Sequence, residues 1–407
     1  MRASVIIPAY NACERLYYNL IALNNQNYPS NEFEVIVINN GSSDKTAKML
    51  SQFHANYRLL TITLVKNRGI AYARNKGILK AVGEILIFHD SDMIATRDFI
   101  KNHTEAHEDT NMVVCGSCWR RVYSYYYKNL RGYLMENFNK IKYKYNIKNQ
   151  YLNNRDKQRL LTKEQILDGS FIDYSFDLNM PFIFSLKQVI EKHGEELVGY
   201  NFPWRFFITN NCSVYKENIM NVGLFDQKIK RYGFEDYDLG IRLHKFGCKY
   251  IFKDNIISVH QEHPTNYTRD DVWYNLYYMC EKYNSSHFVD MLLVCSNMCR
   301  VIDQSLMNDI MNDIKQISQI DKYKELIEVF ITLLKVLRNR YYKKDVPNGK
   351  KIILQYKKSE PNFNIDLQKI QEQGKEIYEE LGLSHFIESL YTLIKDVYDI
   401  DLINVSL

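Results

Sequence analysis

Two aspartates one residue apart, Asp90 and Asp92, stand directly after a short apolar run within the segment Glu84 to Met93. Where a chain turns out of a strand end, carboxylates at this spacing can converge on one divalent cation. Hard cations such as Mg²⁺ and Mn²⁺ take oxygen ligands, and they commonly bind through one or two carboxylates together with the phosphates of a substrate. An Asp-x-Asp tripeptide alone is more often a solvated turn, so its meaning depends on the elements that position it.

Four apolar runs typical of buried strands alternate with helical patterns in the first part of the chain. The strands are predicted over 3–8, 33–38 and 59–65 and, within 84–93, in the apolar run ahead of Asp90, and Leu residues at helical spacing follow the first of them. Strands that alternate with helices predict a parallel, doubly wound α/β sheet whose strands are covered on both faces. Ligands of such sheets bind beyond the carboxyl ends of the strands.

Polar clusters follow the first, second and fourth of these strands, which favours a nucleotide-type site at their carboxyl ends. The simpler alternatives stay open at this point. The segment from Gly41 to Asp44 could be only a tight turn and helix cap, and Arg74 could be a cation on the surface of a helix. The order in which the clusters occur is what favours a site.

The sequence resembles the family 2 glycosyltransferases of GT-A fold. The resemblance is carried by the segments Pro8–Asn11, Val37–Thr46, Asn67–Asn75 and Asp90–Asp92. It implies a GT-A type, Rossmann-like nucleotide-diphospho-sugar transferase domain and a nucleotide-sugar donor, usually a UDP-sugar. It also implies that Asp90 faces the ribose and that Asp92 ligates the metal ion, Mn²⁺ or Mg²⁺.

The resemblance assigns a set of residues to nucleotide-sugar binding. Pro8 and Tyr10 border the uracil, and Arg74 and Asn75 approach the nucleotide. The full set is Pro8, Ala9, Tyr10, Asn11, Asn39, Ser42, Asp44, Arg68, Arg74, Asn75, His89, Asp90, Ser91 and Asp92. One position departs from the family, because Asn39 stands where an aspartate usually pairs with the uracil N–H, although an amide oxygen can accept the same hydrogen bond.

The resemblance returns in Phe207–Val214 and in the block Tyr232–Leu243, which is similar to the Gly-x-Glu-Asp block of chondroitin-polymerase-like and galactosyltransferase-like enzymes. It implies that Asp236 and Glu235 are catalytic, whereas helix capping is the alternative for two acidic residues that open a helix. Asn211, Tyr232 and Gly233 are assigned to the acceptor or sugar. A strand near 256–260 ends at His260, and the resemblance implies that His260 completes the metal site with Asp92, while His263 is expected to orient other groups or lie at the surface.

The predicted organisation is a catalytic domain over 1–265 and a mostly α-helical C-terminal region over 266–407. Residues 119–200 match no family motif and include a helix-like stretch near 137–154. They form an insertion that either shapes an acceptor groove or lid or is a solvated helical excursion. The C-terminal region could form a homo-oligomer, hold a peptide or protein acceptor, or brace the catalytic domain.

Composition narrows the class of protein. With 407 residues and a formal net charge of +5, the chain is mildly basic, which suits anionic small molecules or contact with a membrane surface and gives no case for nucleic acid. No apolar stretch is long enough to span a bilayer, and no signal peptide is expected. Scattered cysteines favour reduced thiols. The expected location is the cytoplasm, with peripheral contact at the inner face of the membrane left open.

The sequence thus predicts a metal-dependent, inverting glycosyltransferase that moves a hexose or N-acetylhexosamine from a UDP-sugar to a hydroxyl or thiol, with Asp236 as the general base. The acceptor is either a glycan, as in capsule or cell-wall polymers, or a Ser, Thr or Cys of a peptide such as a bacteriocin. The alternative is a non-catalytic subunit that binds nucleotide-sugar within a glycan-assembly complex.

Overall fold

The computed structural model describes residues 1–146, 156–265, 268–283, 289–356 and 366–399. The chain divides into two compact units. The α/β unit contains Met1–Gly199, Pro203–Lys230 and Glu235–Asn266, and the helical unit contains Tyr200–Phe202, Arg231–Phe234 and Tyr267–Leu407. The sequence predicted one domain boundary, after residue 265. In the structure two short segments ahead of that boundary, Tyr200–Phe202 and Arg231–Phe234, also belong to the helical unit.

The α/β unit is built on a mixed sheet that contains ten strands of the described chain, in the order β10-β7-β12-β6-β11-β4-β1-β2-β3, with β5 paired to β12. Its first strands are β1 (Ala3–Ala9), β2 (Phe33–Asn39), β3 (Arg58–Thr63) and β4 (Ile85–Phe88). These four are parallel, as predicted. Every residue of β1, β2 and β4 is buried, as expected for strands covered on both faces.

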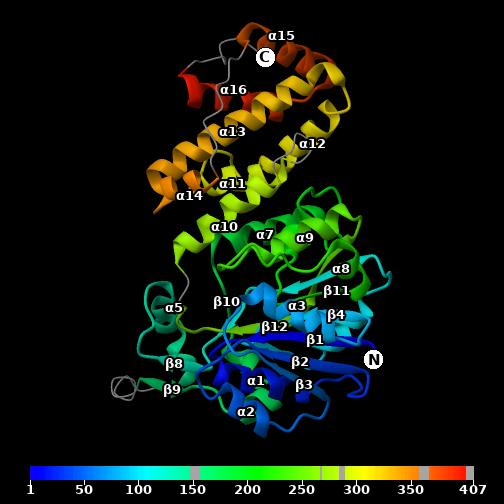
Figure 1. The fold of residues 1–407 in the computed structure, drawn as a ribbon, viewed down its shortest axis with the longest axis vertical. Helices are drawn as coiled ribbons and strands as arrows, with labels where there is room; N and C mark the ends of the chain where they lie inside the picture. Colours follow the sequence, from blue (N-terminus) through cyan, green and yellow to red (C-terminus); the bar gives the residue numbers. More distant parts are fainter. Residues whose placement is uncertain (147–155, 266–267, 284–288, 357–365, 400–407) are drawn as a thin grey trace. The chain divides into compact units, whose positions relative to one another are not determined.

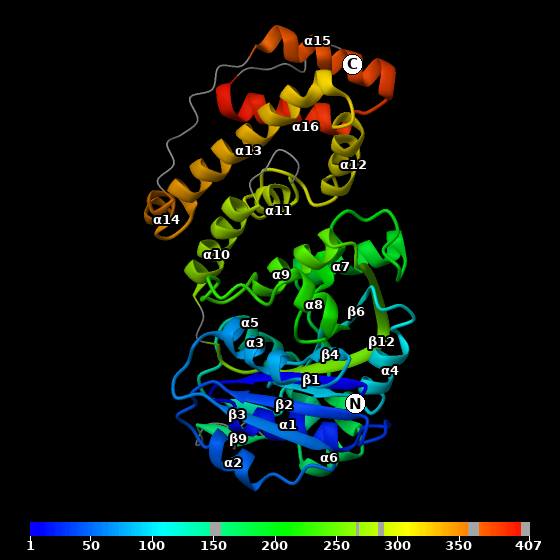
Figure 2. The ribbon, with the colours of Figure 1, turned by 45° about the vertical axis from the view of Figure 1, so that its right-hand side comes forward.

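Helices cover both faces of this sheet. Figures 1 and 2 show α1 (Cys13–Asn24) and α2 (Thr46–Gln52) on one face and α3 (Ile70–Lys80) on the other. Each of the three begins just beyond the carboxyl end of the strand before it. The loops that precede these helices therefore lie along one edge of the sheet, where the predicted nucleotide-binding residues are found.

Beyond these four parallel strands the sheet becomes mixed. β11 (Cys212–Tyr215) lies antiparallel between β4 and β6 (Met112–Ser117), and β12 (Lys249–Gln261) continues parallel to β6. The short strand β5 (Met93–Ala95) pairs antiparallel with the end of β12, with His260 opposite Met93. This pairing brings the end of β12 beside the Asp90–Asp92 segment.

The remaining elements of the α/β unit include two further strands of this sheet, β7 and β10, and a separate two-stranded sheet of β8 and β9. Those up to the predicted insertion and within it are α4 (Phe99–Glu105), β7 (Arg120–Val122), β8 (Tyr125–Tyr127), α5 (Tyr133–Ile141), η1 (Lys142–Tyr145), β9 (Lys157–Arg159), α6 (Lys163–Leu167), η3 (Ser170–Tyr174), β10 (Phe176–Asp177) and α7 (Pro181–His193). After it come η4 (Pro203–Phe206), α8 (Lys216–Val222) and α9 (Glu235–Lys245). The helix expected near 137–154 is represented by α5 and η1, and its residues 147–155 lie outside the described part of the chain.

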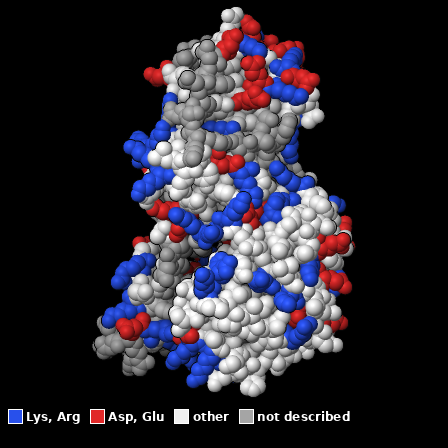
Figure 3. All heavy atoms as spheres, viewed as in Figure 1, with Lys and Arg blue, Asp and Glu red and all other residues white. Residues whose placement is uncertain are grey.

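The helical unit confirms a mostly α-helical C-terminal region. Its elements are α10 (Arg269–Lys282), α11 (Asp290–Met298), α12 (Met307–Ile317), η5 (Asp321–Tyr323), α13 (Lys324–Asp345), α14 (Gly349–Gln355), α15 (Leu367–Leu381) and α16 (His385–Tyr398). Acidic and basic side chains lie side by side on the face of this unit that Figure 3 shows. Within the described ranges, no helix combines the length and apolarity that crossing a membrane requires.

Candidate active site

The loops after β1 and β2 are fastened to each other by the polar residues that the sequence assigned to the nucleotide. The Asn11 Oδ1 atom accepts hydrogen bonds from the backbone N–H groups of Ser43 (2.8 Å) and Asp44 (3.3 Å), and the Asn11 N–H donates to the Ser42 hydroxyl (3.0 Å). Asp44 in turn accepts from the backbone N–H groups that open α1 and α2, at Cys13 and Thr46. In this structure these side chains brace the strand-end loops.

Asn39 has a similar internal role. Its side chain is 1% exposed, and its Oδ1 atom accepts a hydrogen bond from the Ser42 N–H at 3.2 Å. Gly41 has a φ of +74°, and a Cβ there would lie 2.4 Å from the backbone carbon of Lys66, so only glycine fits this turn. Asn39 therefore shapes the turn. Its amide oxygen has two lone pairs, of which one accepts from the Ser42 N–H and the second is the one that a uracil N–H would need.

Several assigned residues do not line the site in the structure. His89 is fully buried between the Asn19 amide and the Ser258 hydroxyl, and burial lowers the pKa of its imidazole to about 3. Asn211 is 1% exposed, and its amide bonds to His103 and to the backbone carbonyls of Ser117 and Ile256. His89 and Asn211 are therefore held within the core by internal hydrogen bonds.

Asn75 and the first residues of the strand-end loop are also internal. The Asn75 amide pairs with both the N–H and the C=O of Phe225, which fixes the loop ahead of α9. Pro8 and Ala9 are buried within β1. By contrast, Tyr10 is 49% exposed, and the exposed Arg68 guanidinium lies 4.7 Å from the centre of the Tyr72 ring. Tyr10 and Arg68 are thus accessible to a ligand.

Arg74 bonds to both acidic segments of the predicted site, the Asp-x-Asp after β4 and the Glu-Asp pair that opens α9. Its guanidinium is 1% exposed, with Nη2 lying 2.8 Å from Asp90 Oδ1 and Nη1 lying 2.8 Å from Glu235 Oε1. The two carboxylates hold the pKa of Arg74 above its usual value despite burial. Arg74 is therefore enclosed by protein carboxylates, and in the structure it pairs with Asp90 and Glu235.

The acidic pair that opens α9 has the features of a reactive centre. Glu235 is 6% exposed, and its Oε2 atom is buried without a hydrogen-bond partner among the described residues. Burial and the adjacent Glu235 raise the pKa of Asp236 to about 7, although Arg74 opposes the shift. A carboxyl group with this pKa can accept a proton near neutral pH and release it again, which is what a general base requires.

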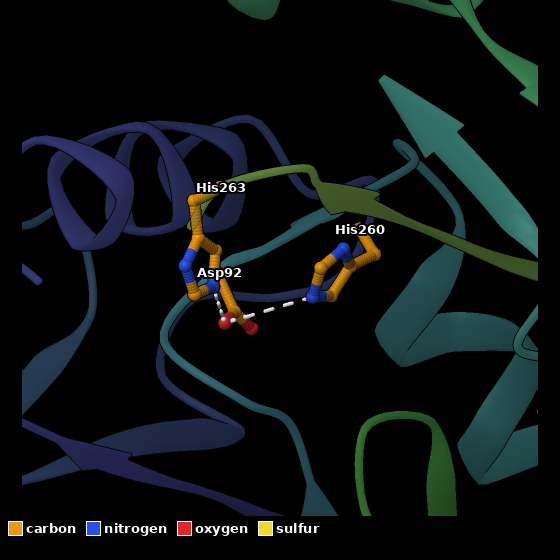
Figure 4. A group of neighbouring side chains, drawn as sticks. All are labelled: Asp92, His260 and His263. Atoms are coloured by element: carbon orange, nitrogen blue, oxygen red, sulfur yellow. Dashed lines mark hydrogen bonds and ion pairs between the residues drawn. The ribbon is translucent and has the colours of Figure 1, made fainter. Parts of the chain in front are cut away.

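Asp92, His260 and His263 form a cluster that could hold a metal ion. Their ligand atoms all lie within 4.8 Å of one another, and Figure 4 shows both imidazoles directed at the Asp92 carboxylate. His263 Nε2 lies 2.9 Å from Asp92 Oδ2, and His260 Nε2 lies 3.7 Å from the same oxygen. Although burial opposes it, His260, His263 and Arg15 together lower the pKa of Asp92, so this carboxylate stays ionised.

The chemistry of this donor set fits Mn²⁺ or Mg²⁺ bound by one carboxylate and imidazole nitrogen. His263 Nδ1 lies 2.8 Å from the Pro264 carbonyl oxygen, which can only accept, so Nδ1 donates there and Nε2 is the nitrogen left to face the Asp92 carboxylate or a cation beside it. His260 Nδ1 faces the Glu262 carboxylate at 3.5 Å, and Glu262 is held in turn by Arg121. Such outer carboxylates orient imidazole ligands.

Sequence reasoning missed three members of this neighbourhood. It left His263 as an orienting or surface group, and it gave no role to Glu262 or Arg15. His263 could have been found from its position, because it follows His260 by three residues and lies just beyond β12. The pairing of β12 with β5 brings both imidazoles close to Asp92. No local pattern marks Arg15, which reaches the site only because α1 begins at the edge where Asp92 lies.

A mixed sheet with an Asp-x-Asp after β4 and a Glu-Asp pair opening α9 agrees with the glycosyltransferase of GT-A fold that the sequence predicts. The sequence profile described as Glycosyl transferase family 2 matches residues 4–170. The uncharacterized glycosyltransferase YfnE of Bacillus subtilis (strain 168) is 42% identical over 407 residues, which cover 99% of this chain and 98% of YfnE. The chain therefore belongs to the family 2 glycosyltransferases.

One further relative matches part of the chain, and one solved structure shares its fold. Chondroitin synthase of Escherichia coli is 24% identical over 267 residues, which cover 64% of this chain and 35% of the synthase. The crystal structure of Staphylococcus aureus TarS 1–349 in complex with UDP-GlcNAc aligns with a TM-score of 0.50 and 14% identity, over 88% of this chain and 92% of TarS. That likeness shows a shared fold.

Proposed function

We propose that this glycosyltransferase moves a hexose or N-acetylhexosamine from a UDP-sugar to an acceptor hydroxyl or thiol, with inversion at the anomeric carbon and with Asp236 as the general base. The observation that carries the proposal is the Arg74 bridge. It ties the Asp90 carboxylate, on the donor side, to Glu235, the immediate neighbour of a carboxyl whose pKa is about 7.

In the proposed reaction, Asp236 takes the proton of the acceptor O–H or S–H as the acceptor attacks the anomeric carbon. A new bond forms between the acceptor oxygen or sulfur and that carbon, the bond from the carbon to the UDP oxygen breaks, and UDP leaves with the electron pair. Glu235 Oε2, buried and without a protein partner among the described residues, orients the acceptor hydroxyl.

Asp92 and His260, with His263 beside them, would hold Mn²⁺ or Mg²⁺ next to the donor diphosphate. The ion would neutralise the charge that builds on the departing UDP. Tyr10 and Arg68 are the accessible groups on the side of the uracil and ribose. UDP-GlcNAc is held by TarS, a protein of the same fold, and this supports a UDP-sugar as donor here.

The experiment is a UDP-release assay across a panel of UDP-sugars, with and without Mn²⁺ and without added acceptor, so that water takes the acceptor's place. We expect slow, Mn²⁺-dependent release from one sugar. Asp92→Ala and Asp236→Asn should abolish it, whereas Asp254→Asn, an exposed aspartate on β12, should not. Near wild-type release by Asp236→Asn contradicts the assignment of the base, and activity that survives chelation contradicts the role of the metal.

The same assay separates the proposal from the alternative of a non-catalytic subunit. A chain that binds UDP with Mn²⁺ but releases UDP from no sugar, even with a wide set of acceptors, would be a binding protein. Both acceptor classes stay in the proposal, and the donor found in the panel is then tested with oligosaccharides and with peptides that contain Ser, Thr or Cys. Transfer to one class decides between them.

A further inference from the structure

The segment that leads into the catalytic helix belongs to the helical unit. Arg231–Phe234 is part of that unit, and the next peptide bond joins Phe234 to Glu235, the first residue of α9. The segment ends in two consecutive residues with positive φ, Gly233 at +92° and Phe234 at +71°. A left-handed phenylalanine is strained and persists only when neighbouring groups hold it.

Asn275, in the middle of α10, supplies that restraint. Its side-chain Nδ2 donates to the carbonyl oxygens of Tyr232 (3.1 Å) and Gly233 (2.8 Å). The residue is 1% exposed, so these bonds form away from competing water. An amide NH₂ has two donor hydrogens, and both are used here on consecutive carbonyls of one turn. The two contacts fix the backbone directly before the catalytic pair.

Arg231 anchors the other end of the same segment to the same helix. The centre of its guanidinium lies 4.3 Å from the centre of the Tyr274 ring, and its Nη1 atom lies 3.5 Å from Asp271 Oδ1. Asp271 also closes the capping box that begins α10, by accepting from the N–H of Thr268. The first two turns of α10 thus hold the segment at both ends.

A second short segment of the helical unit leads to the same catalytic helix. The Asn201 amide donates to Asn312 Oδ1 at 2.7 Å, and the Asn201 N–H donates to Asn308 Oδ1 at 2.8 Å, both on α12. The chain then passes directly into η4, where the Trp204 ring packs edge-on against Tyr237 of α9, with ring centres 5.2 Å apart. Both segments therefore run from the helical unit into the structure around Glu235 and Asp236.

We propose that Asn275 is a positioning residue for catalysis, because it holds the turn that fixes where Glu235 and Asp236 lie at the start of α9. The helical unit then serves the reaction as the anchor of this turn, whichever acceptor is used. The catalytic part of this inference rests on the proposed function, whereas the anchoring part stands on the contacts of Asn275 alone.

Asn275→Asp is the sharpest test because it keeps the shape of the side chain and removes both donor hydrogens. A carboxylate oxygen would then face two carbonyl oxygens at about 3 Å, where the contact becomes repulsive. We expect the turn to open and the start of α9 to shift. A shift of about 1 Å at a catalytic group can cost on the order of 100-fold in rate.

Three measurements follow on the full chain. Hydrogen–deuterium exchange should become faster in peptides that cover 231–238, UDP and Mn²⁺ affinity should stay within about twofold, and UDP release from the active sugar should fall at least about tenfold. The acid limb of the rate–pH profile should also move to lower pH, because a displaced Asp236 is better hydrated. Asn139→Asp, the same change at an exposed position of α5, is the matched control. Arg231→Gln is the milder second variant, expected to act in the same direction.

The outcomes separate the two proposals. Unchanged exchange over 231–238 in Asn275→Asp, or release within twofold of an active wild type, overturns the positioning role and leaves the proposed function standing. If the wild type releases UDP from no donor, the proposed function is overturned, and with it the catalytic role of Asn275. Faster exchange over 231–238 in Asn275→Asp would then support only the anchoring of this turn by Asn275. Weakened UDP or Mn²⁺ binding in both variants would overturn the inference in favour of a general structural role.

Discussion

Replacing Arg74 by methionine should destabilise the α/β unit strongly, and in a pH-dependent way. The guanidinium is 1% exposed and bonds at 2.8 Å to Asp90, whose side chain is 29% exposed, and to Glu235, which is 7% exposed. Removal of one partner from a buried ion pair costs about 3–5 kcal/mol, because the remaining charges are left uncompensated. Since two carboxylates lose their partner here, we expect the upper part of that range at pH 8.

The sign of the pH dependence follows from the pKa shifts. Burial already raises the pKa of Asp90 to about 6 and of Asp236 to about 7, and Arg74 opposes both shifts. Loss of Arg74 raises both pKa values further above those of the unfolded chain. A raised carboxyl pKa removes stability as the pH rises through it, so the penalty of Arg74→Met should be largest at pH 8 and clearly smaller at pH 5.

The assay is urea unfolding at the two pH values, followed by tryptophan fluorescence, because two of the three tryptophans, Trp119 and Trp204, belong to the α/β unit. Arg68→Met, at an exposed arginine, should change stability by less than about 0.5 kcal/mol. Arg74→Met with Glu235→Gln should regain about half of the loss, since one of the two stranded charges is gone. A penalty below about 1 kcal/mol at pH 8, or equal penalties at pH 8 and pH 5, would refute the reasoning.

Three further outcomes are expected at the site. Sugar transfer should fall about tenfold per pH unit below pH 7, because protonated Asp236 cannot accept a proton, and a flat rate–pH profile from pH 5 to 8 would contradict this. Asp236→Asn should be more stable than the wild type at pH 8, by at most ~4 kcal/mol, since the raised pKa makes the ionised form costly, and denaturant unfolding checks the sign. His263→Ala should weaken Mn²⁺ binding at least about tenfold in a titration followed by electron paramagnetic resonance, whereas His54→Ala, at an exposed histidine, should not.

The sequence predicted the strands and helices that carry the site because their patterns are local. A continuous apolar run followed by a polar turn marks a strand that is covered on both faces, and this holds for β1, β2 and β4. The direction of β11 could not be predicted in this way. A strand's direction depends on how the chain returns to the sheet, and here it returns only after residues 119–200, where local pattern does not predict the path of the chain.

Local pattern also could not separate residues that touch a ligand from those that hold the loops. Asn11, Asp44 and Arg74 are polar residues at strand ends, and the structure uses all three to pair with other parts of the protein. A polar side chain at such an edge serves either purpose, and only the positions of its partners decide. The partner of Arg74, Glu235, is 161 residues away in sequence, so no local pattern contains this pairing.

The distribution of charge around the site explains why its four carboxylates behave differently. Asp90, Glu235 and Asp236 share one buried cation, Arg74, and this excess of negative charge, added to burial, keeps the pKa of Asp236 near 7. Asp92 instead faces Arg15 and two imidazoles, which lower its pKa. Carboxylates whose surroundings drive their pKa values apart take different roles in a reaction. Asp236, with too little positive charge near it, is suited to the proposed role of proton acceptor, and Asp92, with an excess of positive charge near it, is suited to the proposed role of metal ligand.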